Sequence, residues 1–185
     1  MIKFGVGQPV RRKEDQRLVT GSGNYADDVR YDGQHYAVMV RSPYAHARIR
    51  KLETADATGM PGVVAILTAK ELAEDKVGTL RCLAPMENID GTPQATPPRQ
   101  IMAADRVRFV GDMVAMVVAT SVDAAQDAAE AVQVDYEMLP SVTDLASAMD
   151  SGQPEVWPEH VKNNTAFHWA TGDKDKVDAA FASAA

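Results

Sequence analysis

Residues 113–139 read MVAMVVATSVDAAQDAAEAVQVDYEML, and this stretch decides the fold class. The segment 113–120 is apolar at almost every position, which is typical of a central strand covered on both faces. Ser121 is a suitable helix N-cap, and Asp123 suits the positive end of a helix dipole. Helical spacing then predicts a helix through Val132, with one apolar stripe made of Val122, Ala125, Ala129 and Val132.

The next segment, 133–139, alternates between apolar and polar residues. This period of two predicts a half-buried strand with Val134, Tyr136 and Met138 facing inward. The strand–helix–strand run indicates an α+β domain, in which we expect a mixed sheet with two or three helices packed on it. Similar patterns predict further strands at 35–41, 47–53, 63–67, 106–109 and 166–171. Helices are expected at 55–59, from Thr68 with a capping box to Glu71, at 144–149 and at 173–185.

Two segments lack such periodicity. Residues 1–30 contain several glycines and Pro9, and we interpret them as an extended N-terminal arm. Residues 75–104 contain four prolines and predict a long loop, which is uncommon in a compact domain unless it has a function.

Composition excludes several classes of protein. The chain has 185 residues, 45% of them hydrophobic and 24% charged, which is incompatible with a disordered chain. Its net charge is −7 and its basic residues are scattered, so we expect no nucleic-acid partner. No apolar run reaches the roughly 20 residues of a membrane span. The single cysteine, Cys82, excludes an internal disulfide, and we expect a cytoplasmic protein.

No motif identifies a reaction. The histidines are not spaced as metal ligands, and the sequence has no phosphate-binding loop and no nucleophile elbow. We therefore assign no catalytic, cofactor-binding or metal-binding residue within this chain. A small hydrolase that uses Cys82, or a serine, together with His46 remains an alternative without motif support.

The segment Arg41-Ser42-Pro43-Tyr44-Ala45-His46 is expected to be structural. Pro43 ends a strand because proline lacks the amide proton, and it favours an extended Ser42. The His46 imidazole is predicted to bond to backbone near the arm. Gly111 is expected to hinge the two strands on either side of it.

Five strings occur in one order along the chain: residues 12–28 (RKEDQRLVTGSGNYADD), 40–47 (VRSPYAHA), 61–63 (PGV), 108–112 (RFVGD) and 134–140 (VDYEMLP). Together they resemble the N-terminal domain of the large subunit of molybdenum hydroxylases. This is the family of xanthine dehydrogenase, aldehyde oxidase and aerobic carbon monoxide dehydrogenase, and the chain is most similar to the carbon-monoxide-dehydrogenase-like large subunit.

The resemblance implies an α/β hammerhead domain over 31–145. Residues 146–185 would then be a linker and helix leading into a missing molybdopterin-binding domain. In the complete enzyme the resemblance implies molybdenum on molybdopterin cytosine dinucleotide, with iron–sulfur clusters and FAD on partner subunits. Such enzymes hydroxylate a C–H bond or oxidise carbon monoxide. The fragment itself would be a scaffold and assembly domain without a cofactor, and its exposed surfaces would favour self-association.

The 75–104 loop carries the remaining functional expectation. In enzymes that the chain resembles, the corresponding stretch lies near the approach to the molybdenum centre. The loop is therefore expected to be mobile here and to form part of a substrate entrance, through Leu83, Pro85, Met86, Ile89 and Pro97. An alternative is a freestanding interaction module whose proline-rich loop binds a partner.

Overall fold

The computed structural model describes residue 7 and residues 9–184, and the chain divides into two compact units between His35 and Tyr36. The N-terminal unit contains the one-turn helix α1 (Asp15–Val19) and the 3-10 turn η1 (Ala26–Asp28). None of its described residues is buried. The second unit holds all the described strands.

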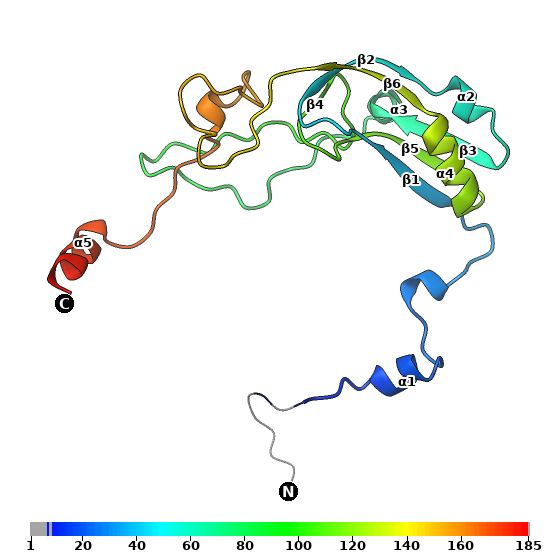
Figure 1. Ribbon diagram of the computed structural model, residues 1–185, viewed down its shortest axis with the longest axis horizontal. Coiled ribbons are helices and arrows are strands. Elements are labelled where there is room, and N and C mark those ends of the chain that lie inside the picture. The colour runs from blue at the N-terminus through cyan, green and yellow to red at the C-terminus, as the bar shows by residue number, and fades with distance from the viewer. Residues whose placement is uncertain (1–6, 8, 185) are drawn as a thin grey trace, which may run out of the picture. The chain divides into compact units, whose positions relative to one another are not determined.

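The first sheet of the second unit has the order β1-β5-β3 (Figure 1). It is built from β1 (Tyr36–Arg41), β5 (Met113–Ala119) and β3 (Val63–Thr68), and both pairings are antiparallel. The central position of β5 confirms the prediction from its apolar sequence.

The second sheet has the order β4-β2-β6, from β4 (Arg106–Val107), β2 (Ala47–Glu53) and β6 (Gln133–Met138), and it is also antiparallel. The α+β class is confirmed, but the expected single mixed sheet is instead two small antiparallel sheets. The chain passes from β5 to β6 through a helix, and these two strands belong to different sheets. Strand periodicity predicts which residues face inward, but it does not say which strands pair.

Helix α4 (Val122–Ala131) covers one face of the β1-β5-β3 sheet, where it contacts all three strands. The Ser121 hydroxyl accepts a hydrogen bond from the Ala124 amide (3.1 Å), which confirms the predicted N-cap. Ala125 and Ala128 are buried, whereas Val122 is 45% exposed. The inward stripe therefore begins one turn later than its spacing predicted.

Two shorter helices flank this layer. Helix α2 (Ala55–Thr58) buries Ala57 beside α4. Helix α3 (Ala69–Glu74) begins at the predicted capping box, where the Glu71 carboxylate accepts from the Thr68 amide (2.8 Å). The hydrogen bond from the Thr68 hydroxyl lowers the pKa of Glu71.

Two apolar clusters form the core. The first joins the two sheets through Ala47, Ala103, Val107 and Val114. The second lies under α4 and contains Ala57, Val117, Ala128 and Val132. Val134 and Tyr136 of β6 pack inward as predicted, but Met138 is 71% exposed, so the last residue of the alternation was assigned to the wrong face.

The C-terminal part contains η2 (Lys162–Asn164) and α5 (Lys174–Ser183), whose N-cap is Asp173. The helix expected at 144–149 is wrong, because this segment forms turns. Its Asp144 carboxylate accepts from the Ser147 amide (3.0 Å), as an N-cap would, but the chain continues as turns and not as a helix. The strand expected at 166–171 is also absent from the described residues. None of the described helices is both long and apolar enough to span a membrane.

Candidate functional site

A group of long-range polar contacts lies where β1 ends and β5 begins. The Ser42 amide donates to the Asp112 carbonyl (2.8 Å), and the Gly111 amide donates to the Ser42 carbonyl (2.8 Å). The Arg41 guanidinium also reaches this turn and donates to the Gly111 carbonyl (2.9 Å). Gly111 has a φ of +90°, a conformation that favours glycine. These bonds hold the end of β1 beside the start of β5, about 70 residues away in the sequence.

Ser42 is buried and closes the turn around Pro43. Its hydroxyl accepts a hydrogen bond from the Tyr44 amide (3.0 Å). The Tyr44 ring packs edge-on against the ring of Tyr136 in β6, with 5.2 Å between the centroids. Burial raises the pKa of Tyr136. This segment thus ties the end of the first sheet to the second.

His46 is also buried, and its Nδ1 lies 2.7 Å from the carbonyl oxygen of Pro140. A carbonyl only accepts, so Nδ1 carries the proton. The predicted bond to backbone is therefore present, but its acceptor follows β6 and is not near the arm. No hydrogen bond joins His46 to Cys82 or to a serine among the described residues, so nothing there supports a hydrolase site.

Asp112 and Arg108 are partly buried in the turn after β4. The Asp112 carboxylate accepts from the Arg108 amide (3.0 Å), and burial raises the pKa of this carboxyl group. Burial also lowers the pKa of the Arg108 guanidinium.

The Arg108 side chain holds the segment that follows the second sheet. Its guanidinium carbon lies 3.5 Å from the centroid of the Trp157 ring, and its Nε donates to the Val156 carbonyl (3.3 Å). Arg106 adds an ion pair with Glu159 (3.8 Å). We call these contacts the Arg108–Trp157 clamp. No sequence motif indicated it, because its partners lie about 50 residues apart and make no local pattern.

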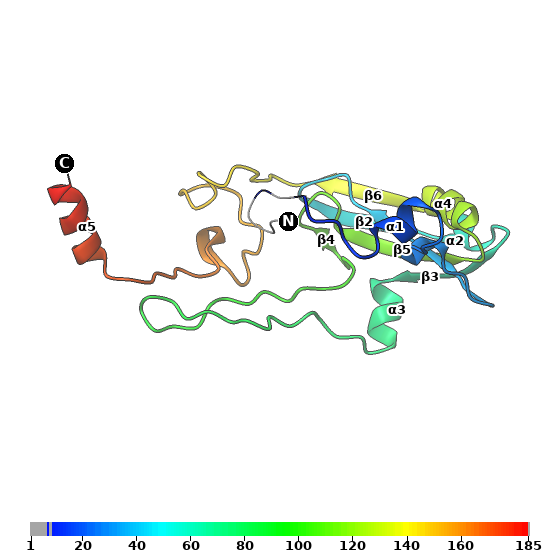
Figure 2. The ribbon, with the colours of Figure 1, turned by 90° about the horizontal axis from the view of Figure 1, so that it is seen from below.

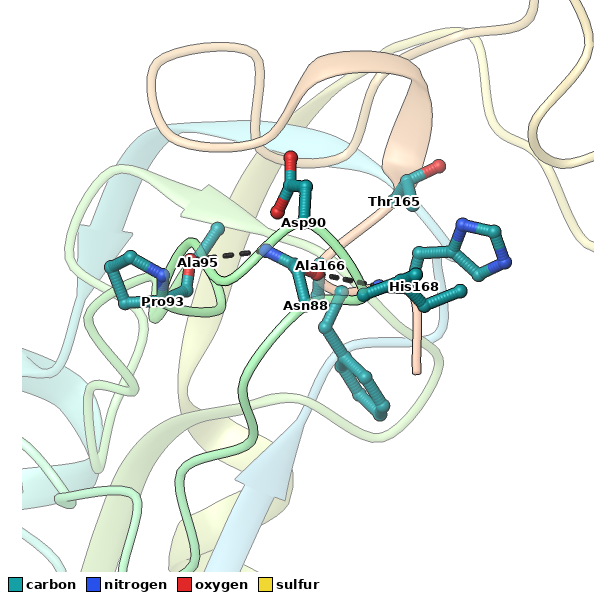
Figure 3. A pocket seen from close by; sticks show the side chains of 9 residues that line it. Asn88, Asp90, Pro93, Ala95, Thr165, Ala166 and His168 are labelled. Atoms are coloured by element: carbon teal, nitrogen blue, oxygen red, sulfur yellow. Dashed lines mark hydrogen bonds between the residues drawn. The ribbon is translucent and has the colours of Figure 1, made fainter. Parts of the chain in front are cut away.

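The long 75–104 segment is a loop, as predicted, and the structure pairs it with the chain after η2. The Ala95 amide donates to the Ala166 carbonyl (2.8 Å), and the Ile89 amide donates to the His168 carbonyl (2.9 Å). Asn88 bridges the two segments, as Figure 3 shows: its side chain accepts from the His168 amide (2.7 Å) and donates to the Pro93 carbonyl (3.2 Å). The backbone of the expected strand at 166–171 is thus bonded to this loop. A hollow of about 550 Å³ lies between the two segments.

The five residues assigned to the substrate entrance all lie in this loop but differ in exposure. Leu83, Pro85 and Ile89 are exposed, while Met86 and Pro97 are half-buried. The Met86 amide donates to the side-chain oxygen of Gln94 (2.6 Å), which folds the loop back on itself. Ile89 also lines the hollow.

The donor groups of the described residues do not form a metal centre. No group of three or more His, Cys, Asp or Glu side chains is arranged to hold a metal ion within the part of the chain that the structure describes. Cys82 is exposed, and its sulfur accepts from the Gln94 amide group (3.7 Å). These side chains therefore do not fit the ligand set of a molybdenum or iron–sulfur group.

Comparison with known proteins places the fold in a family. Residues 20–140 match the a/b hammerhead domain of aldehyde oxidase and xanthine dehydrogenase. Because the match covers more than half of the chain, this protein belongs to that family. The chain resembles the N-terminal domain of molybdenum hydroxylase large subunits.

Individual relatives agree. The chain is 38% identical to the carbon monoxide dehydrogenase large chain of Afipia carboxidovorans, over 97% of this chain and 22% of the relative. It is 38% identical to the nicotine 6-hydroxylase large subunit of Paenarthrobacter nicotinovorans, over 80% and 17%. Among solved structures, CO dehydrogenase from Oligotropha carboxidovorans superposes with a TM-score of 0.74 at 36% identity, over 97% and 22%. The chain thus spans about a fifth of the length of these relatives.

Proposed function

We propose that this chain is the N-terminal hammerhead segment of the molybdopterin-binding large subunit of a molybdenum-dependent oxidoreductase, in which it acts as a scaffold and assembly domain. The observation that carries the proposal is the hammerhead match over residues 20–140, in a chain that covers only 22% of a carbon monoxide dehydrogenase large chain. The two sheets and the Arg108–Trp157 clamp would hold the segments between them in place.

The complete enzyme would oxidise carbon monoxide or hydroxylate a C–H bond. The names of the relatives support both options, since one is a carbon monoxide dehydrogenase and another a nicotine 6-hydroxylase. The relatives are named as a large chain and a large subunit, which supports the presence of smaller partner subunits. These partner subunits would carry iron–sulfur clusters and FAD. Molybdopterin cytosine dinucleotide with molybdenum would be held by residues outside this chain. We also propose that the complete enzyme is cytoplasmic.

In this proposal, the residues of this chain hold other segments in place and take part in no chemical step. No group of three or more His, Cys, Asp or Glu side chains among the described residues is arranged to hold a metal ion. Binding, redox change and proton transfer would belong to other domains and subunits. We also propose that the hammerhead domain extends from about residue 31 to about residue 145. The chain after residue 145 is joined to the preceding domain at two places, by the Arg108–Trp157 clamp and by the hydrogen bonds between residues 88–95 and 166–168. These contacts support a compact unit that includes part of the chain after 145.

The loop residues Leu83, Pro85, Met86, Ile89 and Pro97 would form part of the substrate entrance. Exposed Leu83 and Ile89 support this role because apolar side chains on a long loop favour contact with another surface. The bonds from Asn88 to the chain after η2 would hold the loop at a defined place (Figure 3).

The size of the natural polypeptide tests the proposal. An antibody raised against residues 36–185 should detect a polypeptide about four to five times longer than this chain, given the 22% coverage of the relative. Peptide mapping of that band should recover sequences from 36–140. A natural product of about 20 kDa would contradict the proposal and favour a freestanding module with a proline-rich binding loop.

A further inference from the structure

Two consecutive residues of η2 have a left-handed backbone conformation. The φ angles of Asn163 and Asn164 are +51° and +54°. Residues with a side chain seldom adopt this conformation, although asparagine tolerates it better than most. It persists only where the surrounding contacts stabilise it. Among the described residues, Asn163 forms hydrogen bonds through its backbone alone, whereas the side chain of Asn164 forms three.

The Asn164 side chain joins three places in the chain before it. Its Oδ1 accepts from the Val156 amide (2.8 Å), and its Nδ2 donates to the carbonyls of Ala148 and Pro154 (2.9 Å each). The amide group thereby uses both of its donors and its acceptor. Because the partners lie 8 to 16 residues before Asn164, these bonds tie residues 148–164 into a closed loop. We call residues 148–164 the Asn164 loop.

The Arg108–Trp157 clamp attaches the Asn164 loop to the second sheet. Val156 takes part in both sets of bonds, since its amide donates to Asn164 and its carbonyl accepts from the Arg108 Nε (3.3 Å). The next residue is Trp157, whose ring contacts the Arg108 guanidinium. Arg108 directly follows β4. These contacts hold Asn164 in a defined position relative to the second sheet.

The chain bonds to the long loop directly after Asn164. The carbonyls of Ala166 and His168 accept from the amides of Ala95 and Ile89, as Figure 3 shows for this part of the chain. In Figures 1 and 2 the long loop (green) and the chain after β6 (yellow to orange) extend from the same end of the two sheets. The residues that hold the long loop are therefore only two and four positions beyond Asn164.

We propose that Asn164 is a positioning residue for the long loop: it closes the Asn164 loop on the Arg108–Trp157 clamp, and so sets the place of residues 166–168 and of residues 88–95 bonded to them. The inference rests on the proposed function, in which this loop forms part of the substrate entrance. Coupling of this kind needs a continuous set of contacts, and each step here is a hydrogen bond or a ring contact. The left-handed backbone adds support, because a costly conformation is kept where three hydrogen bonds require it.

Asn164→Gly separates the side-chain bonds from the backbone conformation. Glycine adopts a positive φ without strain, so the variant loses the three bonds and keeps the local backbone. Asn163→Gly is the matched control, because it makes the same replacement at the neighbouring left-handed position. Asn164→Asp is the conservative variant, since aspartate can still accept from the Val156 amide but cannot donate. All variants are made in the full-length polypeptide, purified with its bound partners.

Hydrogen–deuterium exchange followed by mass spectrometry measures the position of the loop. Asn164→Gly should speed exchange about tenfold in peptides that contain the Ile89 and Ala95 amides, because the bonds that hold their acceptors in place are lost. Peptides from β5 should exchange as in the parent protein. Asn163→Gly should leave both sets of peptides unchanged. Asn164→Asp should give a smaller increase than Asn164→Gly, and it carries the same test if the glycine variant does not fold.

Kinetics of the same variants give a readout that a merely structural role would not move. The enzyme is assayed with carbon monoxide, with nicotine and with other N-heterocycles, because relatives are named for the first two compounds. For the compound that the parent enzyme oxidises, Asn164→Gly should raise KM about fivefold and change kcat by less than about twofold.

The two measurements separate this inference from the proposed function. Unchanged exchange at Ile89 and Ala95 in Asn164→Gly, or an equal increase in Asn163→Gly, would overturn the inference and leave the entrance role standing. Faster exchange at these residues together with an unchanged KM would support the positioning of the loop and overturn its role as a substrate entrance.

Discussion

The guanidinium carbon of Arg108 lies 3.5 Å from the centroid of the Trp157 ring, so a residue directly after β4 holds a segment almost 50 residues further along the chain. The same side chain donates from Nε to the Val156 carbonyl. Arg106 and Glu159 add a second contact between the same two segments.

Replacement of Trp157 by leucine should therefore destabilise the protein. A partly desolvated cation–π contact is worth about 1–2 kcal/mol, and that free energy of unfolding should be lost. Urea denaturation followed by circular dichroism measures the change. Trp169→Leu is the matched control, because Trp169 is half exposed and should cost less than about 0.5 kcal/mol. Equal losses in the two variants would contradict the clamp.

His46→Ala should lower the melting temperature. The variant removes the bond from Nδ1 to the Pro140 carbonyl, worth about 1 kcal/mol, and also the packing of a side chain that is buried. We expect a total loss of about 2 kcal/mol, or roughly 4–8 °C in a domain of this size. His168→Ala, at an exposed histidine, serves as the control. An unchanged melting temperature in His46→Ala would show that this histidine is not structural.

Asp112→Asn should alter the pH dependence of stability. Burial raises the folded-state pKa of Asp112 above 3.8, so folding favours the protonated acid. The contribution of this group to the free energy of unfolding should decrease as pH rises through the folded-state pKa. Asparagine keeps an oxygen that can accept from the Arg108 amide, so the variant should lose this decrease without losing that bond.

Glu71→Gln should alter the pH dependence of stability in the opposite direction. The Thr68 hydroxyl lowers the folded-state pKa of Glu71 below 4.5, so ionised Glu71 stabilises the fold above that value. Its contribution should disappear as pH falls through the folded-state pKa. The free energy of unfolding, measured at a series of pH values, tests the predictions for both variants. If Asp112→Asn left the pH profile of the parent protein unchanged, the burial of Asp112 would have no energetic consequence.

Leu83→Ser should affect catalysis by the complete enzyme more than stability. Leu83 is 93% exposed in the 75–104 loop, so serine should not disturb the fold, but it would change an apolar surface at the proposed entrance. We expect a change of about fivefold in the Michaelis constant, near 1 kcal/mol of binding free energy. Leu145→Ser is the matched control, since Leu145 is 92% exposed and lies outside the loop. Lost stability with unchanged kinetics would contradict the entrance role.

Local signals in the sequence predicted much of the fold. The apolar run of β5 indicated its central position, and Ser121 and Thr68 marked the starts of two helices through their hydroxyl groups. Two predicted elements did not form. Asp144 caps a turn that does not continue into a helix, and the backbone at Ala166 bonds to the long loop instead of to another strand.

Long-range features were not predictable from spacing alone. Nothing local pairs Arg108 with Trp157, and the alternation of β6 did not show that this strand joins β2 in a second sheet. His46 was recognised as a residue that bonds to backbone, but its acceptor, Pro140, lies 94 residues away. These contacts depend on how the two sheets meet, and that arrangement is set by packing between distant segments.

The molybdenum content of the natural protein tests the central claim most directly. The polypeptide that contains residues 36–185 should be purified from its source with its bound partners and analysed by inductively coupled plasma mass spectrometry. The account predicts about one molybdenum atom per polypeptide, together with iron from partner subunits. A pure, folded polypeptide with no molybdenum when grown with ample molybdate would contradict it.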